Sequence, residues 1–370
     1  TAISGTARRH ILLLFIIPKT LQLVMLNPEI QSKNMNDVYQ VFKSLLNKPV
    51  EEGCYAADSI PFARQHKIGV SSDGYPMFFI QASGKENALD ITLEFIKVLF
   101  NRTCRIIENN EIQEMEGYAI ISISASNVDY QKYFIDVVCI LLHELPSNVT
   151  VKILKTELMK IANLFSNLNK PSKKTLQGLW AELFIIEQAK NPEYLLMSWH
   201  TSPNDKFDFN DGKDKIEVKS TGTVRRVHKF SLEQLHPNIN SNLLIASVFV
   251  IETGHGKTIF DLKDSICNKV SNFELQYRLN EVIVQTLGRD FDKVNDISFD
   301  YQQAFDTLAF YDFQDIPSIA IENIPKSISN IHFDCDLSAV RTIKDNYFDI
   351  NASSLFKSCL LYTSPSPRDA

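Results

Sequence analysis

The stretch KFDFNDGKDKIEVK, residues 206–219, decides how we interpret the chain. Apolar and charged residues alternate on both sides of Asp211-Gly212. This dipeptide is preferred in a two-residue type I′ turn, because both central positions of that turn need positive φ. The stretch therefore predicts a β-hairpin in which Asp208 faces Lys215 across the two strands.

Such a hairpin would bring two carboxylates and one amine to the same face of a sheet. Asp208 and Glu217 become diagonal neighbours with Cβ atoms about 7 Å apart, and Lys219 shares the face of Glu217 because strand side chains alternate. Two carboxylates at that separation can converge on one magnesium ion. Lys219 can orient a water molecule or stabilise a phosphate as negative charge grows, as phosphodiester hydrolysis requires. The hairpin thus predicts a catalytic centre of these three residues.

A helix is predicted over TLQGLWAELFIIEQAK, residues 175–190, because apolar residues recur at helical spacing. Glu182 borders the apolar stripe of this helix, and Gly178 one turn earlier allows a close approach to a sheet. We therefore expect Glu182 to be an additional or water-mediated metal ligand. The plain alternative stays open, because charged residues that alternate on a strand, and glutamates beside a helix stripe, are common without any catalytic role.

Composition excludes some classes of protein. The chain has 370 residues, of which 44% are hydrophobic and 22% charged, as is ordinary for a globular protein of two domains. Its net charge of -6 provides no overall positive field, so any contact with DNA must come from a local patch. The six cysteines are scattered with no C-x-x-C pair, which predicts neither a zinc knuckle nor a disulfide framework and favours a cytoplasmic location.

The two ends of the chain are set apart from the functional interpretation. The apolar run at residues 11–17 is far shorter than the roughly 20 residues of a membrane helix, so no membrane segment is expected. Residues 1–34 are expected to be a non-native or disordered leader, with Met25 or Met35 as the natural start. Residues 359–370, CLLYTSPSPRDA, resemble a translated sequencing adapter and are expected to be an adapter-derived tail.

The remaining chain predicts a mixed α/β fold with a central mixed sheet flanked by helices. Residues 35–167 alternate turn residues and β-favouring runs and end in two helices, which predicts a strand-rich N-terminal domain. Residues 168–272 form the predicted catalytic core, with strands expected at YLLMSWH, residues 194–200, and at NLLIASVFVIET, residues 242–253. Residues 273–358 are predicted to be a C-terminal extension.

At these positions the sequence resembles the PD-(D/E)XK nuclease superfamily. Asp208 matches the first acidic residue, Glu217 and Lys219 match the (D/E)-X-K pair, and Glu182 matches the helix glutamate. The usual proline directly before the aspartate is absent, since Pro203 lies five residues earlier. The segments GLWAELFIIE, DFN, IEVKST, RRVHKFSLEQL and DIPSI together resemble the family of PD-(D/E)XK motif proteins, over residues 35–340.

The resemblance implies a restriction-endonuclease-like core and a magnesium-dependent endonuclease that hydrolyses DNA in a restriction or phage-defence system. Manganese would be a substitute ion, and Asp208, Glu217 and Glu182 would be the metal ligands. DNA is the expected partner, and a homodimer and complexes with other subunits of such a system stay open. Two alternatives also stay open: a catalytically silent DNA-binding or assembly subunit, and a nuclease that acts on RNA or branched DNA.

The segment after the lysine is the predicted site of DNA contact. Residues 205–229 contain seven Lys or Arg against five Asp or Glu, so this segment is positive within an acidic protein. Phosphate contact is the functional interpretation, and a solvated loop is the alternative. For His228 the alternatives are a bond to phosphate, proton transfer, or a structural role. The basic cluster and the matches to the family pattern give these candidates: Ser220, Thr221, Arg225, Arg226, His228, Lys229 and Gln234.

Overall fold

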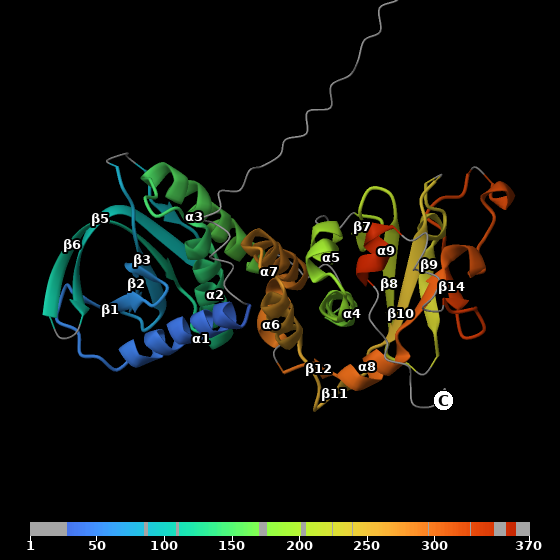
Figure 1. Cartoon of the computed structure of the whole chain (residues 1–370), viewed down its shortest axis with the longest axis horizontal. Coiled ribbons are helices and arrows are strands. Elements are labelled where there is room, and N and C mark those ends of the chain that lie inside the picture. Colours follow the sequence, from blue (N-terminus) through green and yellow to red (C-terminus); the bar gives the residue numbers. More distant parts are fainter. Residues whose placement is uncertain are drawn as a thin grey trace, which may run out of the picture.

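Two main β-sheets, of six and four strands, have helices between them, and two further pairs of strands, β11-β12 and β14-β9, occur in the described part of the chain (Figure 1). The computed structural model describes residues 28–84, 88–108, 111–169, 176–200, 205–223, 225–238, 240–294, 296–325, 327–343 and 353–359, with the backbone alone at 28–36 and 292–293. Within these ranges, no helix combines the length and the apolar character that a membrane crossing requires.

The N-terminal half is built on a six-stranded sheet of order β1-β2-β3-β6-β5-β4. Strand β1 also pairs in parallel with β5, so the sheet curls back on itself. Helices α2 and α3 begin at side-chain caps; Asn127, for example, accepts from the backbone N–H of Asp129 at 2.7 Å. The strands and the two closing helices predicted for this half are confirmed. The elements are α1 (Pro28–Leu45), β1 (Tyr55–Ile60), β2 (Ala63–Val70), β3 (Pro76–Gln81), β4 (Ile91–Thr92), β5 (Ile96–Glu108), β6 (Glu111–Ile123), α2 (Val128–Glu144) and α3 (Val151–Ser166).

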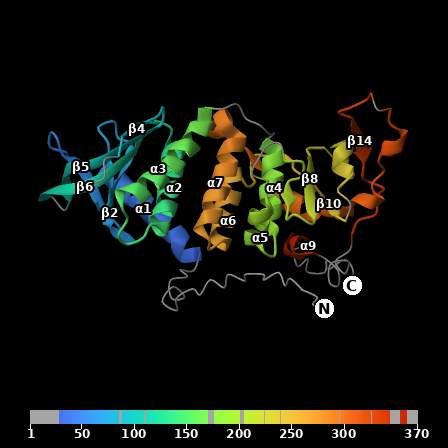
Figure 2. The same ribbon diagram turned by 90° about the horizontal axis from the view of Figure 1, so that it is seen from above.

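Two helices, α6 (Ile259–Lys269) and α7 (Phe273–Leu287), lie between the two halves, as Figure 2 shows from above. The hydroxyl of Tyr133 on α2 donates to the backbone oxygen of Asn280 on α7 at 3.0 Å. The ring of His143, also on α2, stacks between the rings of Phe62 and Phe273. One hydrophobic core therefore continues from the N-terminal sheet through α6 and α7 to the second sheet.

The second sheet has the order β13-β10-β8-β7, with β8 and β10 parallel and the two outer pairs antiparallel. One face carries Ile216, Leu244 and Ala246, which pack in the main core together with α4. The other face carries Leu243 and Ile245, which pack against β9 and β14. This mixed sheet covered by helices confirms the predicted fold class. The elements are α4 (Leu176–Gln188), β7 (Phe209–Asn210), β8 (Lys215–Thr221), β9 (Val227–Ser231), β10 (Leu243–Phe249), β11 (Glu252–Thr253), β12 (Ser298–Phe299), α8 (Tyr301–Thr307), β13 (Ala309–Asp312), β14 (His332–Asp336) and α9 (Ser354–Cys359).

The strand predicted at residues 194–200 is wrong, because helix α5 (Pro192–Ser198) occupies most of this stretch. Asn191 is its N-cap and accepts from the backbone N–H of Tyr194 at 3.2 Å. Pro192 occupies the first turn, where its fixed φ and missing N–H suit a helix start. These start signals outweigh the β-favouring composition of the short apolar run that follows.

The predicted two-residue turn is also wrong, although the hairpin itself forms. The observed register pairs Phe209 with Ile216, two residues away from the predicted one. The Asp211 carboxylate accepts from the backbone N–H groups of Lys213 at 3.0 Å and Asp214 at 2.8 Å, which stabilises a longer loop. Continued by one residue, the observed register brings Asp208 opposite Glu217 rather than Lys215.

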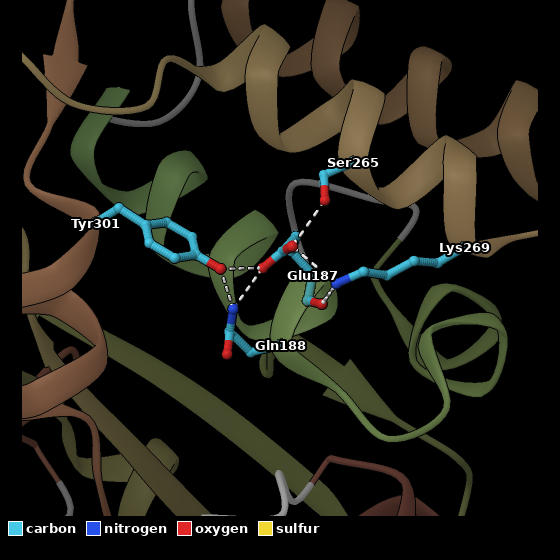
Figure 3. Close-up of polar contacts among 5 residues, drawn as sticks. All are labelled: Glu187, Gln188, Ser265, Lys269 and Tyr301. Carbon is cyan, nitrogen blue, oxygen red and sulfur yellow. Dashed lines mark hydrogen bonds and ion pairs between the residues drawn. The ribbon is translucent and has the colours of Figure 1, made fainter. Parts of the chain in front are cut away.

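The C-terminal end of α4 is fixed by the buried carboxylate of Glu187 (Figure 3). This carboxylate accepts hydrogen bonds from Ser265 and Lys269 on α6 and from Tyr301 on α8, each at 2.7 Å. Burial raises the pKa of Glu187, but the three hydrogen bonds outweigh it and lower the pKa to about 2. Lys269 also donates to the backbone oxygen of Glu187 at 2.6 Å, where a helix end favours a cation. These contacts hold α4 against α6 and α8.

Candidate metal centre

Glu182, on α4, points into the protein interior. Glu182 is only 3% exposed, and its Oε2 accepts a hydrogen bond from the indole N–H of Trp199 at 2.8 Å. The Nε2 of His200 lies 3.0 Å from the same oxygen. Trp199 and His200 directly follow α5, so the turn after that helix supplies both partners. A buried carboxylate needs such partners, because its desolvation is otherwise costly. Glu182 is therefore not a solvent-exposed glutamate beside the apolar stripe of its helix.

Asp208 lies just before β7 and is 9% exposed. Its Oδ2 accepts from the backbone N–H of Val218 at 2.8 Å, which ties the carboxylate to β8. Its backbone oxygen accepts from the N–H of His200 at 2.8 Å, and Trp199 forms an antiparallel bridge with Phe209. The segment after α5 is therefore held beside the start of the hairpin, and this pairing brings His200 next to Asp208.

Glu182, His200 and Asp208 form the candidate metal centre. Each offers one ligand atom, and these atoms all lie within 4.8 Å of one another. Ligands of one divalent ion at about 2.1 Å lie up to about 4.2 Å apart, so a small closure would suffice. Carboxylate oxygens suit magnesium and manganese, and an imidazole nitrogen adds affinity for transition metals. The donor set therefore fits a single divalent cation, which would also offset the repulsion between the two acids.

Glu217 and Lys219 lie on the face of β8 that meets β9 and the short helix η3 (Leu232–Leu235). Glu217 forms an ion pair with Lys219 at 2.8 Å and accepts from the amide of Gln234 at 2.5 Å. Lys219 also donates to the amide oxygen of Gln234 at 3.1 Å. The structure thus brings together three of the residues predicted for catalysis and DNA contact. Glu217 is not a member of the group that Glu182, His200 and Asp208 form.

The residues predicted to touch DNA differ in their surroundings. Arg226 donates to the backbone oxygen and the hydroxyl of Ser247, at 3.0 and 2.7 Å, and to the backbone oxygen of Thr307. His228 is buried with its Nε2 2.8 Å from the Ser247 hydroxyl. Burial, together with nearby Lys219 and Arg226, lowers the pKa of His228 to about 4. Arg226 and His228 could bind a phosphate only if these internal hydrogen bonds were broken.

Three other members of that predicted set, Ser220, Arg225 and Lys229, lie at or near the surface. Arg225 and Lys229 are exposed around the start of β9, and Ser220 is half-buried near the end of β8. Thr221 is buried, and its hydroxyl lies 3.0 Å from that of Thr223. Arg225 and Lys229 therefore have the accessibility that phosphate contact requires, and their role stays a prediction.

His200 and its neighbour Trp199 were not among the residues singled out from the sequence. The incorrect strand prediction at residues 194–200 is the reason, because a strand there would not place His200 beside Asp208. The signal that could have revealed the turn is Asn191-Pro192, which marks a helix start. No local pattern, however, links His200 to a glutamate on α4.

Comparison with known proteins supports the family expected from the motif residues. No curated protein and no solved structure matched the chain. A sequence model of the family described as "Putative PD-(D/E)XK family member, (DUF4420)" matches residues 58–338, which include the whole second sheet and every residue of the candidate centre. The chain therefore belongs to this PD-(D/E)XK family.

Proposed function

We propose that the protein is a divalent-metal-dependent endonuclease that hydrolyses DNA phosphodiester bonds, in a restriction or phage-defence system. The observation that carries this proposal is the buried group of Glu182, His200 and Asp208 at the start of the β7–β8 hairpin. Family membership supports it, because the same hairpin carries the (D/E)-X-K pair Glu217 and Lys219. The proposed ion is magnesium, with manganese as a substitute.

A bound divalent cation would polarise a phosphoryl oxygen and lower the pKa of a water molecule. The residues of the chain supply the rest. Glu182 and Asp208 would hold the cation, and the Trp199 indole fixes the orientation of Glu182. The ammonium group of Lys219, positioned by Glu217 and Gln234, offsets negative charge that grows on the phosphate. Each role uses a polar group whose partners are already in place before substrate binds.

Plasmid cleavage by the purified protein tests the proposal. Supercoiled DNA would be incubated with magnesium or manganese and with three proteins: wild type, Asp208→Asn and Lys219→Met. Either substitution should slow cleavage at least about 100-fold, as loss of one electrostatic group in an active site commonly does. Lys213→Gln is the matched control, because Lys213 is exposed in the hairpin loop.

Two outcomes would count against the nuclease. Undiminished cutting by Lys219→Met would refute the assignment of the centre. A wild-type protein that binds DNA but leaves it intact with both ions would instead identify a silent DNA-binding or assembly subunit.

A further inference from the structure

A polar pocket of about 350 Å³ opens beside the candidate metal centre. We call it the lysine pocket; its lining includes His200, Asp205, Lys206, Phe207, Lys215 and Arg278. His200 belongs both to this lining and to the metal centre, so the two sites share a wall. Any ligand in the pocket would therefore lie next to the proposed cleavage site.

Lys215 is the most informative residue of the lysine pocket. It is 4% exposed, and its ammonium group donates to the hydroxyl of Ser241 at 2.8 Å and to the backbone oxygen of Lys213 at 3.2 Å. Both acceptors are neutral. Among the residues that the structure describes, no carboxylate forms an ion pair with Lys215. A buried charge without a counter-ion is costly, which points to an anion that arrives from outside.

Other buried lysines of the chain show the contrast. Lys67 and Lys263 are each 5% exposed. Lys67 pairs with Glu108 at 2.7 Å, and Lys263 pairs with Asp136 at 3.1 Å. The protein thus provides an internal carboxylate at these two comparable positions but leaves Lys215 with neutral partners.

Two further cations line the same pocket. Lys206 donates to the backbone oxygen of His236 at 3.2 Å, and Arg278 donates to the backbone oxygen of Trp199. The Nε of Arg278 is buried and lacks a hydrogen-bond partner within the described part of the chain. The ammonium groups of Lys206 and Lys215 both lie against the Phe207 ring, at 5.0 and 6.0 Å from its centroid. Asp205 is the carboxylate in the lining, so the cations outnumber it.

We propose that the lysine pocket binds a phosphate group of the nucleic acid substrate, adjacent to the phosphate that is cleaved at the metal centre. An arginine fork and lysine ammonium groups are well suited to phosphate oxygens. The phosphate supplies the negative charge that Lys215 lacks, and its position beside His200 fixes the strand relative to the metal ligands. This inference rests on the proposed nuclease function, and it names residues that position the substrate.

The test measures binding without cleavage. Fluorescence anisotropy in EDTA would give the affinity for a labelled DNA duplex at several salt concentrations. Lys206→Gln and Arg278→Gln should each weaken binding about tenfold and reduce the salt slope by about one, as expected for one lost phosphate contact. Lys213→Gln is the control, because its exposed side chain lies outside the lining. Lys215→Gln should behave like the other pocket variants, and thermal melting would show whether it folds.

The phosphate could belong to the strand interior or to its 5′ end. A comparison of oligonucleotides with a 5′-phosphate and with a 5′-hydroxyl distinguishes them. A terminal phosphate predicts that its removal weakens wild-type binding about as much as Lys206→Gln does, whereas an internal phosphate predicts no effect. Both results support the pocket, provided that Lys206→Gln and Arg278→Gln lose affinity.

The proposal is overturned if Lys206→Gln and Arg278→Gln bind DNA with the affinity and salt slope of Lys213→Gln, or if the wild-type protein binds neither oligonucleotide. Cleavage distinguishes this failure from failure of the nuclease. Unchanged binding by the pocket variants, together with loss of cleavage in Asp208→Asn, would remove the pocket and leave the metal-dependent nuclease in place.

Discussion

Replacing Glu187 with glutamine should destabilise the protein at neutral pH and do so less in acid. Its folded pKa of about 2 lies below the ordinary value of 4.5, so ionisation of this buried carboxylate favours the folded state. A difference of about 2.5 pKa units corresponds to about 3.4 kcal/mol. This contribution is present above the unfolded pKa and is lost as pH falls through the folded pKa. At pH 3.5 it should have dropped to about 2 kcal/mol.

Urea unfolding followed by circular dichroism at pH 7 and pH 3.5 measures this contribution. Glu157→Gln is the control, because Glu157 forms a similar 2.8 Å pair with Lys160 but on an exposed helix surface. Such pairs contribute about 0 to 1 kcal/mol. The reasoning is refuted if Glu187→Gln costs no more than Glu157→Gln, or if its cost is the same at both pH values. Helix α4 carries both Glu187 and the candidate ligand Glu182. A large loss of stability in Glu187→Gln would therefore also show how strongly the Glu187 contacts hold this helix in place.

Three further predictions concern the centre and the helix layer. His200→Ala should weaken manganese binding about tenfold to 100-fold in calorimetric titration, and unchanged affinity would remove His200 from the ligand set. Glu217→Gln should lower manganese affinity less than Asp208→Asn does, because Glu217 lies outside the group of three; an equal loss would place Glu217 among the ligands. Burial lowers the pKa of His143 to about 4, so stability should fall as pH drops from about 6.5 towards 4, and His143→Phe should flatten that dependence in unfolding experiments.

Much of the second sheet could be predicted from local patterns. The apolar run around β10 and the alternating residues of β8 have the lengths and spacings of strands, and α4 has a helical apolar repeat over its whole length. The acid and amine of Glu217 and Lys219 share a face in any β-strand, so their proximity also follows from sequence alone. These features depend on neighbours in the chain.

The metal group could not be predicted in the same way, because tertiary contacts assemble it. His200 reaches Glu182 only through the turn after α5 and the bridge between Trp199 and Phe209. The hairpin register depends on the hydrogen bonds that the Asp211 side chain accepts from the backbone of its own loop. The turn preference of the Asp-Gly dipeptide does not predict these bonds. Strand β13 joins the sheet from far downstream, in a region assigned to an extension.

Helix α7 limits how this chain can be divided for study. The backbone oxygen of Asn280 accepts a hydrogen bond from the Tyr133 hydroxyl of the N-terminal half. Arg278, half a turn earlier, donates to the backbone oxygen of Trp199 beside the candidate metal centre. A recombinant fragment that stops at residue 272 would keep Glu182, His200 and Asp208 but would lose this shared support and the edge strand β13. Inactivity of such a fragment would therefore say nothing about the chemistry of the intact chain.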